Sequence, residues 1–109
     1  MADDPIQRFT LLLLFQAQQD HAMELVVSPT DREPSPIRYK VEDTWYDVSP
    51  PPAHVVPAVV AELGRLAAFK QRPFPKEGLI DLEFSGVQLR WSVRMASANS
   101  DCILTRIEQ

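Results

Sequence analysis

Four basic residues have the type and spacing of a binding surface. Arg38 and Lys40 alternate with apolar residues along one predicted strand, and Arg90 and Arg94 do so along another. Because side chains two apart on a strand point to the same face, each pair presents its charges on one side of a sheet. The four residues, as neighbours across that sheet, could bind phosphate or an acidic partner.

A second interpretation of the same residues needs no ligand. Acidic side chains close to them could pair with the four cations on a solvated strand surface, and exposed pairs of this kind add little stability. Those acidic residues are Glu42, Asp47, Asp81 and Glu83.

Three aromatic residues allow the same two interpretations. Trp45, Tyr46 and Trp91 could form a surface for association, because tryptophan and tyrosine are enriched where binding energy concentrates. They could equally pack in the core or form cross-strand pairs. We expect Trp91 in the core, because it lies in the clearest alternating strand of the chain, and Trp45 fits either location.

The sequence contains no pattern typical of catalysis. Its three glycines stand far apart, which excludes a glycine-rich phosphate loop. His21 and His54 lie in separate segments, and neither has a spacing to Cys102 that would suit zinc. No serine has the flanking signature of a hydrolase nucleophile. We expect no enzymatic activity, no cofactor and no metal, and we expect Cys102 to be a small buried side chain.

Composition and charge favour one soluble domain over residues 1–109. The chain is 45% apolar and 24% charged, and its net charge is −4. A negative net charge disfavours general binding to nucleic acid or to an anionic membrane. The longest apolar run, residues 11–15, is far shorter than the roughly 20 residues of a membrane span. A single cysteine and an acidic start predict a protein of the reducing cytoplasm.

The elements that must position these side chains follow from periodicity and from proline. Helices are predicted near residues 5–20, with Asp3 or Asp4 as the cap, and 53–69, with Pro57 in the first turn. Strands are predicted at 23–27, 37–41, 45–48, 79–84, 87–94 and 102–107, with hairpin turns near 42–44 and 85–86. The fold class is therefore α+β, an antiparallel sheet of about six strands with two main helices on one face.

Such a sheet has a core on its helix side and leaves its other face or an edge free. The free surface is the place where we expect Arg38, Lys40 and Trp45 to meet a partner. The predicted core consists of Leu12, Leu13, Leu25, Val41, Val59, Leu63, Ile80, Leu82, Val93 and Ile103.

Several short segments carry a further signal when they are taken in order. Residues 13–17 read Leu-Leu-Phe-Gln-Ala at the end of the first helix, and residues 22–29 follow as a strand that ends in proline. Residues 37–43 read Ile-Arg-Tyr-Lys-Val-Glu-Asp, and after the next strand come the three prolines 50–52.

The second half of the chain continues the series. A loop with two prolines and a glycine covers residues 71–80, residues 89–94 read Leu-Arg-Trp-Ser-Val-Arg, and residues 102–107 close the chain as a strand. In this order and spacing, from about Ile6 to Ile107, the chain resembles the domain that precedes the nucleotide-binding domain of type II secretion and type IV pilus assembly ATPases. The resemblance implies a PAS-like fold.

The chain departs from that family where the family contacts nucleotide. The family arginine after the loop glycine is Leu79 here, and the arginine of the strand that matches residues 89–94 is Ser92. The family histidine of an earlier strand is Val26, and we expect no nucleotide-binding domain. The resemblance therefore implies a stand-alone copy that keeps the fold and has lost the site.

Three functions remain open on this basis. The first is a non-catalytic interaction or regulatory module that binds a protein partner, such as a bacterial secretion or pilus motor ATPase, or a second copy of itself. The second is an accessory subunit that supplies Arg38, Lys40, Arg90 or Arg94 to the ATP site of a partner. The third is a small-molecule sensor, as PAS-like sheets can enclose a ligand.

Overall fold

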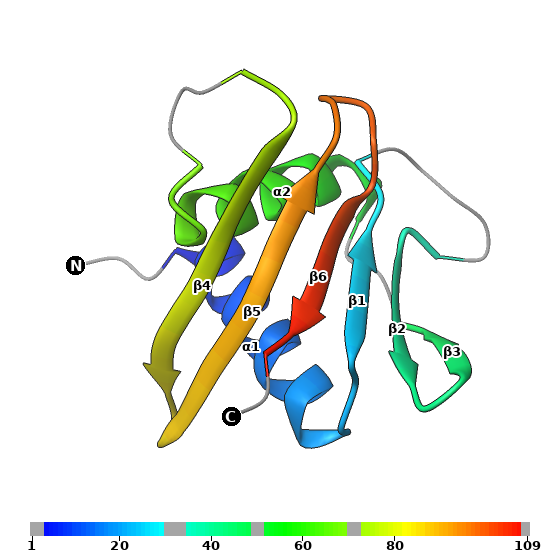
Figure 1. Cartoon of the computed structure of the whole chain (residues 1–109), viewed down its shortest axis with the longest axis vertical. Coiled ribbons are helices and arrows are strands. Elements are labelled where there is room, and N and C mark those ends of the chain that lie inside the picture. The colour runs from blue at the N-terminus through cyan, green and yellow to red at the C-terminus, as the bar shows by residue number, and fades with distance from the viewer. Residues whose placement is uncertain (1–3, 30–34, 49–51, 70–72, 108–109) are drawn as a thin grey trace.

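The computed structural model describes residues 4–29, 35–48, 52–69 and 73–107 of the chain. Its elements are α1 (Pro5–Gln19), β1 (Glu24–Val27), β2 (Ile37–Val41), β3 (Thr44–Asp47), the short 3₁₀ helix η1 (Ala53–Val55), α2 (Val56–Leu66), β4 (Lys76–Phe84), β5 (Val87–Met95) and β6 (Cys102–Arg106). The six strands form one antiparallel sheet in the order β3-β2-β1-β6-β5-β4, and α1 and α2 lie together behind it (Figure 1). The α+β prediction is confirmed.

Helix α1 begins where its capping residues predict. The Asp4 carboxylate accepts hydrogen bonds from the backbone N–H groups of Ile6 (3.0 Å) and Gln7 (3.3 Å), and Pro5 occupies the first turn. These contacts satisfy N–H groups that have no partner inside the helix. The helix ends at Gln19, and His21 adopts a positive φ of 64° just beyond it.

Helix α2 is shorter than predicted. Residues 53–55 form a 3₁₀ turn, Pro57 lies in the first α-helical turn as expected, and the helix ends at Leu66 instead of 69. Ala68 has a φ of 58°, and the Phe69 N–H donates to the Gly64 carbonyl at 2.9 Å. This is the hydrogen-bond pattern of a Schellman turn, which reverses the chain at a helix end. It ends the helix early, and it folds Phe69 back onto the helix it has just left.

Strand β4 is longer than predicted, because its partner strand extends the ladder. Lys76, Glu77 and Gly78 pair with Met95, Arg94 and Val93, so the strand begins three residues before the predicted start. A Cβ atom on Gly78 would lie 2.1 Å from the carbonyl oxygen of Ala67. Glycine is therefore needed where β4 passes the end of α2.

Both predicted hairpins are confirmed. Glu42 and Asp43 connect β2 to β3, and Ser85 and Gly86 connect β4 to β5. Ser85 and Gly86 both have positive φ, which matches the two-residue turns that suit the strand twist. Glu42 also has positive φ, so the first hairpin turns without a glycine.

The core lies between the helices and the sheet, and six of the ten predicted core residues are buried in it. Those six are Leu13, Leu25, Val59, Leu63, Ile80 and Val93.

Four core predictions were wrong in whole or in part. Leu12 is 47% exposed, because the buried stripe of α1 runs through Thr10, Leu13, Leu14 and Ala17, and Leu12, one residue before Leu13, points about 100° away from that residue. Val41, Leu82 and Ile103 are only half-buried. Val41 ends its strand, Leu82 belongs to an edge strand, and Ile103 points to the face without helices.

Candidate functional site

The strand register places the five predicted binding residues on the face of the sheet that the helices leave open. Arg38 lies opposite Val26, Val26 opposite Ile103, and Ile103 opposite Arg94, which makes one row across four strands. Residues that lie opposite each other in an antiparallel pair share a face, and so do residues two apart on one strand. Arg90 therefore lies on the same face, as do Lys40 and its opposite residue Trp45.

The expectation that all four cations are neighbours was wrong. Strands β1 and β6 separate β2 from β5, so Arg38 and Arg94 are three strand spacings apart, about 14 Å. That distance exceeds the Debye length of about 8 Å at physiological ionic strength. The charges on β2 and those on β5 are therefore largely screened from each other and would not attract one ligand together.

The first end of the row is a cluster of two cations on one aromatic ring. The Arg38 guanidinium carbon lies 5.1 Å, and the Lys40 ammonium nitrogen 5.8 Å, from the centre of the Trp45 ring. Trp45 is 41% exposed, and every residue of its strand, β3, is exposed at the edge of the sheet. We call Arg38, Lys40 and Trp45 the basic corner. Among the residues that the structure describes, neither cation forms an ion pair.

At the second end of the row, on β5, one of the two arginines lies close to a carboxylate of the same chain. Arg90 Nε lies 3.7 Å from an Asp81 carboxylate oxygen, and the side-chain amide of Gln88 donates to the other oxygen at 2.5 Å. Arg94 is exposed and lies opposite Glu77 on β4. The interpretation as a paired strand surface therefore describes Arg90. At the basic corner, Asp47 lies opposite Arg38 and Glu24 lies opposite Lys40, but no described carboxylate forms an ion pair with either cation.

The remaining candidate side chains do not form a reactive site. Cys102 is buried on the helix side of β6, and burial, with a smaller effect of Asp101, raises the pKa of its thiol to about 12. It therefore stays protonated and unreactive at neutral pH. His21, just after α1, and His54, just before α2, are both exposed. Within the described ranges no three His, Cys, Asp or Glu side chains gather to hold a metal ion.

Tyr39 lies on the helix side of β2 and ties that strand to α1. Its hydroxyl donates to the Asp20 carboxylate at 2.8 Å, and this bond, with burial, raises the tyrosine pKa. Its ring packs against Tyr46 of β3 with the ring centres 5.9 Å apart. These contacts hold the β2–β3 hairpin, and with it the basic corner, against the body of the protein.

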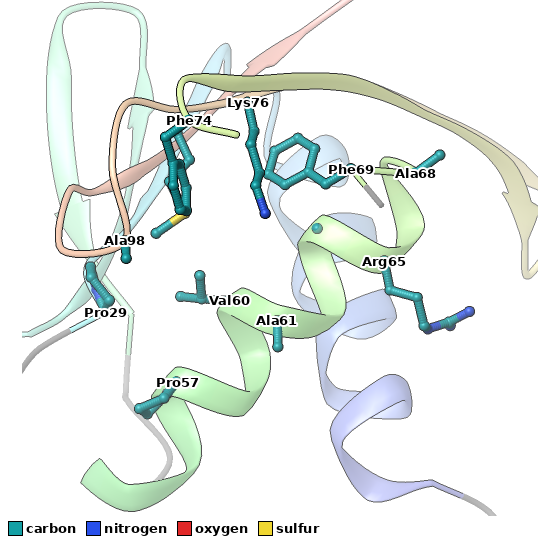
Figure 2. Close-up of a pocket in the computed structure, with 12 residues that line it drawn as sticks. Pro29, Pro57, Val60, Ala61, Arg65, Ala68, Phe69, Phe74, Lys76 and Ala98 are labelled. Atoms are coloured by element: carbon teal, nitrogen blue, oxygen red, sulfur yellow. The ribbon is translucent and has the colours of Figure 1, made fainter. Parts of the chain in front are cut away.

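Sequence reasoning missed a pocket on the opposite side of the molecule. A cavity of about 690 Å³ lies between α2, the segment that enters β4, and the end of β5 (Figure 2). Its walls include Val60, Ala61, Phe69, Phe74, Lys76 and Met95. No local sequence signal marks it, because its residues come from four segments of the chain and meet only after the turn at the end of α2.

None of the helices in the described part of the chain is both long and apolar enough to span a membrane. No protein-family model matches the chain, and no curated protein matches it.

Proposed function

We propose that the protein is a non-catalytic interaction module whose basic corner binds an acidic surface on a protein partner. One observation carries this proposal. Both helices cover the same face of the sheet. On the other face, Arg38 and Lys40 lie over the ring of Trp45, and neither cation has an ion-pair partner among the described residues.

The chemistry of the corner suits a protein surface. Tryptophan and arginine are the residues that most often concentrate binding energy at an interface. The Trp45 ring holds both cationic groups above an apolar surface, so a carboxylate on the partner could pair with either of them. The free edge of β3 lies beside them and offers unpaired backbone groups, which a strand of the partner could use.

The resemblance to the N-terminal domains of type II secretion and type IV pilus ATPases supports one class of partner. We propose a motor ATPase of this kind, or another component of its machine, in the cytoplasm. The proposed role is regulatory, because this chain has Leu79 and Ser92 where that family has arginines that reach nucleotide.

The test is a binding measurement with purified candidate ATPases from the same genome. The triple variant Arg38→Ala, Lys40→Ala and Trp45→Ala should lose binding by roughly tenfold or more, because each lost hot-spot residue costs about 1–2 kcal/mol or more. Raising the salt concentration should weaken the wild-type complex mainly through its association rate.

The chain offers a matched control. Lys76 also places its ammonium group over an aromatic ring, 4.6 Å from the centre of Phe74, but at the pocket on the far side of the fold. The double variant Lys76→Ala, Phe74→Ala should therefore bind as wild type does. Equal binding by wild type and by a folded triple variant would overturn the proposed surface.

The accessory-subunit alternative has a distinct signature in the same assay. If Arg38 or Lys40 entered the ATP site of the partner, its removal would abolish stimulation of ATP hydrolysis while the complex still formed. The interaction module predicts instead that binding and any effect on the ATPase rate disappear together.

A further inference from the structure

The pocket behind the sheet has the dimensions and the walls of a small-molecule site. Its volume of about 690 Å³ falls within the range of roughly 300–1,000 Å³ that ligand pockets occupy. Val60 of α2 forms one wall, and Phe69, Phe74 and Met95 form others (Figure 2). It lies on the helix side of the sheet, so it is independent of the basic corner.

Backbone geometry gives the pocket a firm frame. The Schellman turn returns Phe69 onto α2, where its ring would lie 3.0 Å from a Cβ atom placed on Gly64. Gly78 brings β4 against the end of the same helix. The approach at Gly78, which needs glycine, therefore fixes how close β4 lies to the end of α2, and the contact at Gly64 holds Phe69 against the helix.

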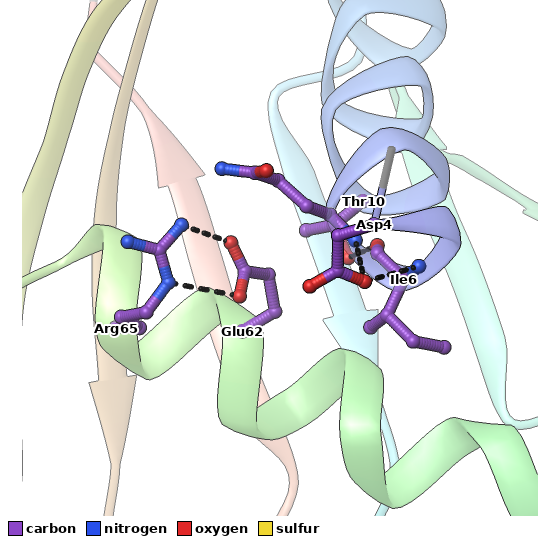
Figure 3. A network of polar contacts seen from close by, with 6 residues as sticks. Asp4, Ile6, Thr10, Glu62 and Arg65 are labelled. Carbon is purple, nitrogen blue, oxygen red and sulfur yellow. Dashed lines mark hydrogen bonds and ion pairs between the residues drawn. The ribbon is translucent and has the colours of Figure 1, made fainter. Parts of the chain in front are cut away.

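The charges in the pocket are unbalanced. Among the described residues that line it, only Arg65 and Lys76 are charged, and neither is acidic. Both carboxylate oxygens of Glu62, a buried residue, accept hydrogen bonds from the Arg65 guanidinium (Figure 3). Figure 2 shows the guanidinium turned away from the pocket. Its charge is thus satisfied outside the cavity.

Lys76 keeps its charge inside the cavity. Its ammonium group lies 4.6 Å from the Phe74 ring centre and points toward α2 (Figure 2). No carboxylate of the described residues pairs with it. Among the residues that the structure describes, Lys76 is thus a cation without an ion-pair partner beside apolar walls.

We propose that this pocket binds a small amphipathic carboxylate, with the acid group on Lys76 and the apolar body against Val60, Phe69 and Met95. A bound neutral apolar molecule would cover the ammonium group without giving it a counter-ion, which is costly. A carboxylate supplies that counter-ion through a charge-assisted hydrogen bond, and its apolar chain covers the walls. The ligand class follows from the combination of one cation and a largely apolar lining.

Decanoate is the probe, and 1-decanol, which has the same chain without the charge, is its matched comparison. The readout is the ¹³C-methyl spectrum of methionine in the full chain, because Met95 lines the pocket whereas Met23 is exposed elsewhere. Decanoate should shift the Met95 signal in a saturable way and leave Met23 unmoved. Decanol should bind roughly tenfold more weakly or worse, since a hydrogen bond to a charged group is lost.

Two variants separate the parts of the proposal. Lys76→Gln should reduce decanoate affinity by about tenfold and leave decanol affinity almost unchanged. Ala98→Phe, in the exposed turn at the rim of the pocket, should weaken both ligands by filling space. Lys40→Gln on the open face is the control lysine and should change neither affinity.

The outcomes that would overturn the proposal are equally concrete. They are an unmoved Met95 signal at saturating decanoate, equal affinity for decanoate and decanol, or unchanged decanoate affinity in Lys76→Gln. None of these results bears on the basic corner, whose test uses a protein partner.

Discussion

The two faces of the sheet treat the same kinds of side chain in opposite ways. Trp91 on the helix side is fully buried, whereas Trp45 on the open side is 41% exposed and carries two cations on its ring. Both tryptophans lie in strands, whose successive side chains point to opposite faces of the sheet. The alternation of side-chain direction along a strand therefore assigns residues to two faces. The position of the helices decides which of these faces is buried in the core.

The two faces also differ in how closely their residues are packed, and therefore in how far a substitution should affect stability. On the helix side, backbone and side chains meet at contact distance, as Gly78 shows against Ala67. On the open side, the large side chains of Trp45 and Leu79 are 41% and 45% exposed, so another molecule can reach them. Stability should therefore depend mainly on the helix side, and binding to a protein partner on the open side.

The largest expected effect is the difference in stability between alanine variants of the two tryptophans. Trp91→Ala should lower the free energy of unfolding by about 3–5 kcal/mol, since it leaves a cavity in the core. Trp45→Ala should lower it by less than about 1 kcal/mol, the scale of an exposed cation–π contact. Urea denaturation measures both values.

If Trp91→Ala does not fold, the more conservative variant Trp91→Phe provides the test. The buried indole N–H of Trp91 has no hydrogen-bond partner among the described residues, so Trp91→Phe removes an unsatisfied donor while keeping an aromatic ring. It should cost clearly less than the alanine change. Similar losses for alanine variants at Trp91 and Trp45 would contradict the contrast between the faces.

The next effect concerns two adjacent residues of β4 that point to opposite faces. Gly78→Ala should destabilise the protein by about 1–3 kcal/mol, because the new methyl group would meet the Ala67 backbone and force a shift. Leu79→Ala, at a residue that is 45% exposed, should cost less than about 1 kcal/mol despite removing more atoms. Thermal or urea unfolding of the two variants gives the comparison, and a larger loss at Leu79 would break it.

The smallest effect is a pH dependence that belongs to the helix side alone. The pKa of the Cys102 thiol is raised by burial to about 12, against 9.0 for an ordinary cysteine. Above pH 9 the unfolded chain releases this proton and the folded chain keeps it, so unfolding becomes easier as pH rises toward 12. At pH 10 the loss is about 1.4 kcal/mol relative to pH 8.

The Cys102→Ala variant isolates this contribution. Tyr39, whose pKa is also raised, contributes in the same direction in both proteins, so the difference between the two pH slopes belongs to the thiol. The wild type should lose stability more steeply than the variant between pH 8 and pH 10. Parallel slopes would show that the thiol ionises equally well in the folded state.

Local chemistry made several parts of the fold predictable. Asp4 and Pro5 indicated the start of α1, and Ser85 with Gly86 indicated a tight hairpin. Alternation along residues 37–41 was enough to place Arg38 and Lys40 on one strand face. Each of these signals lies within a few residues, where capping, φ preferences and strand pleating act directly.

Longer-range features could not be predicted in this way. The end of α2 depends on Ala68 taking a positive φ that alanine rarely adopts, and the start of β4 depends on the ladder with β5. The exposure of Leu12 depends on which side of α1 meets the sheet. These outcomes are set by contacts between segments far apart in the chain.

The sequence by itself determined the α+β class, six of the ten core positions and the faces of the individual strands. Only the tertiary structure decided that β1 and β6 separate the basic corner from Arg90 and Arg94, and that Arg90 meets Asp81. It alone created the pocket around Lys76. The reason is physical, because propensity and periodicity act over a few residues, whereas strand order and cavities arise when distant segments compete for the same apolar surface.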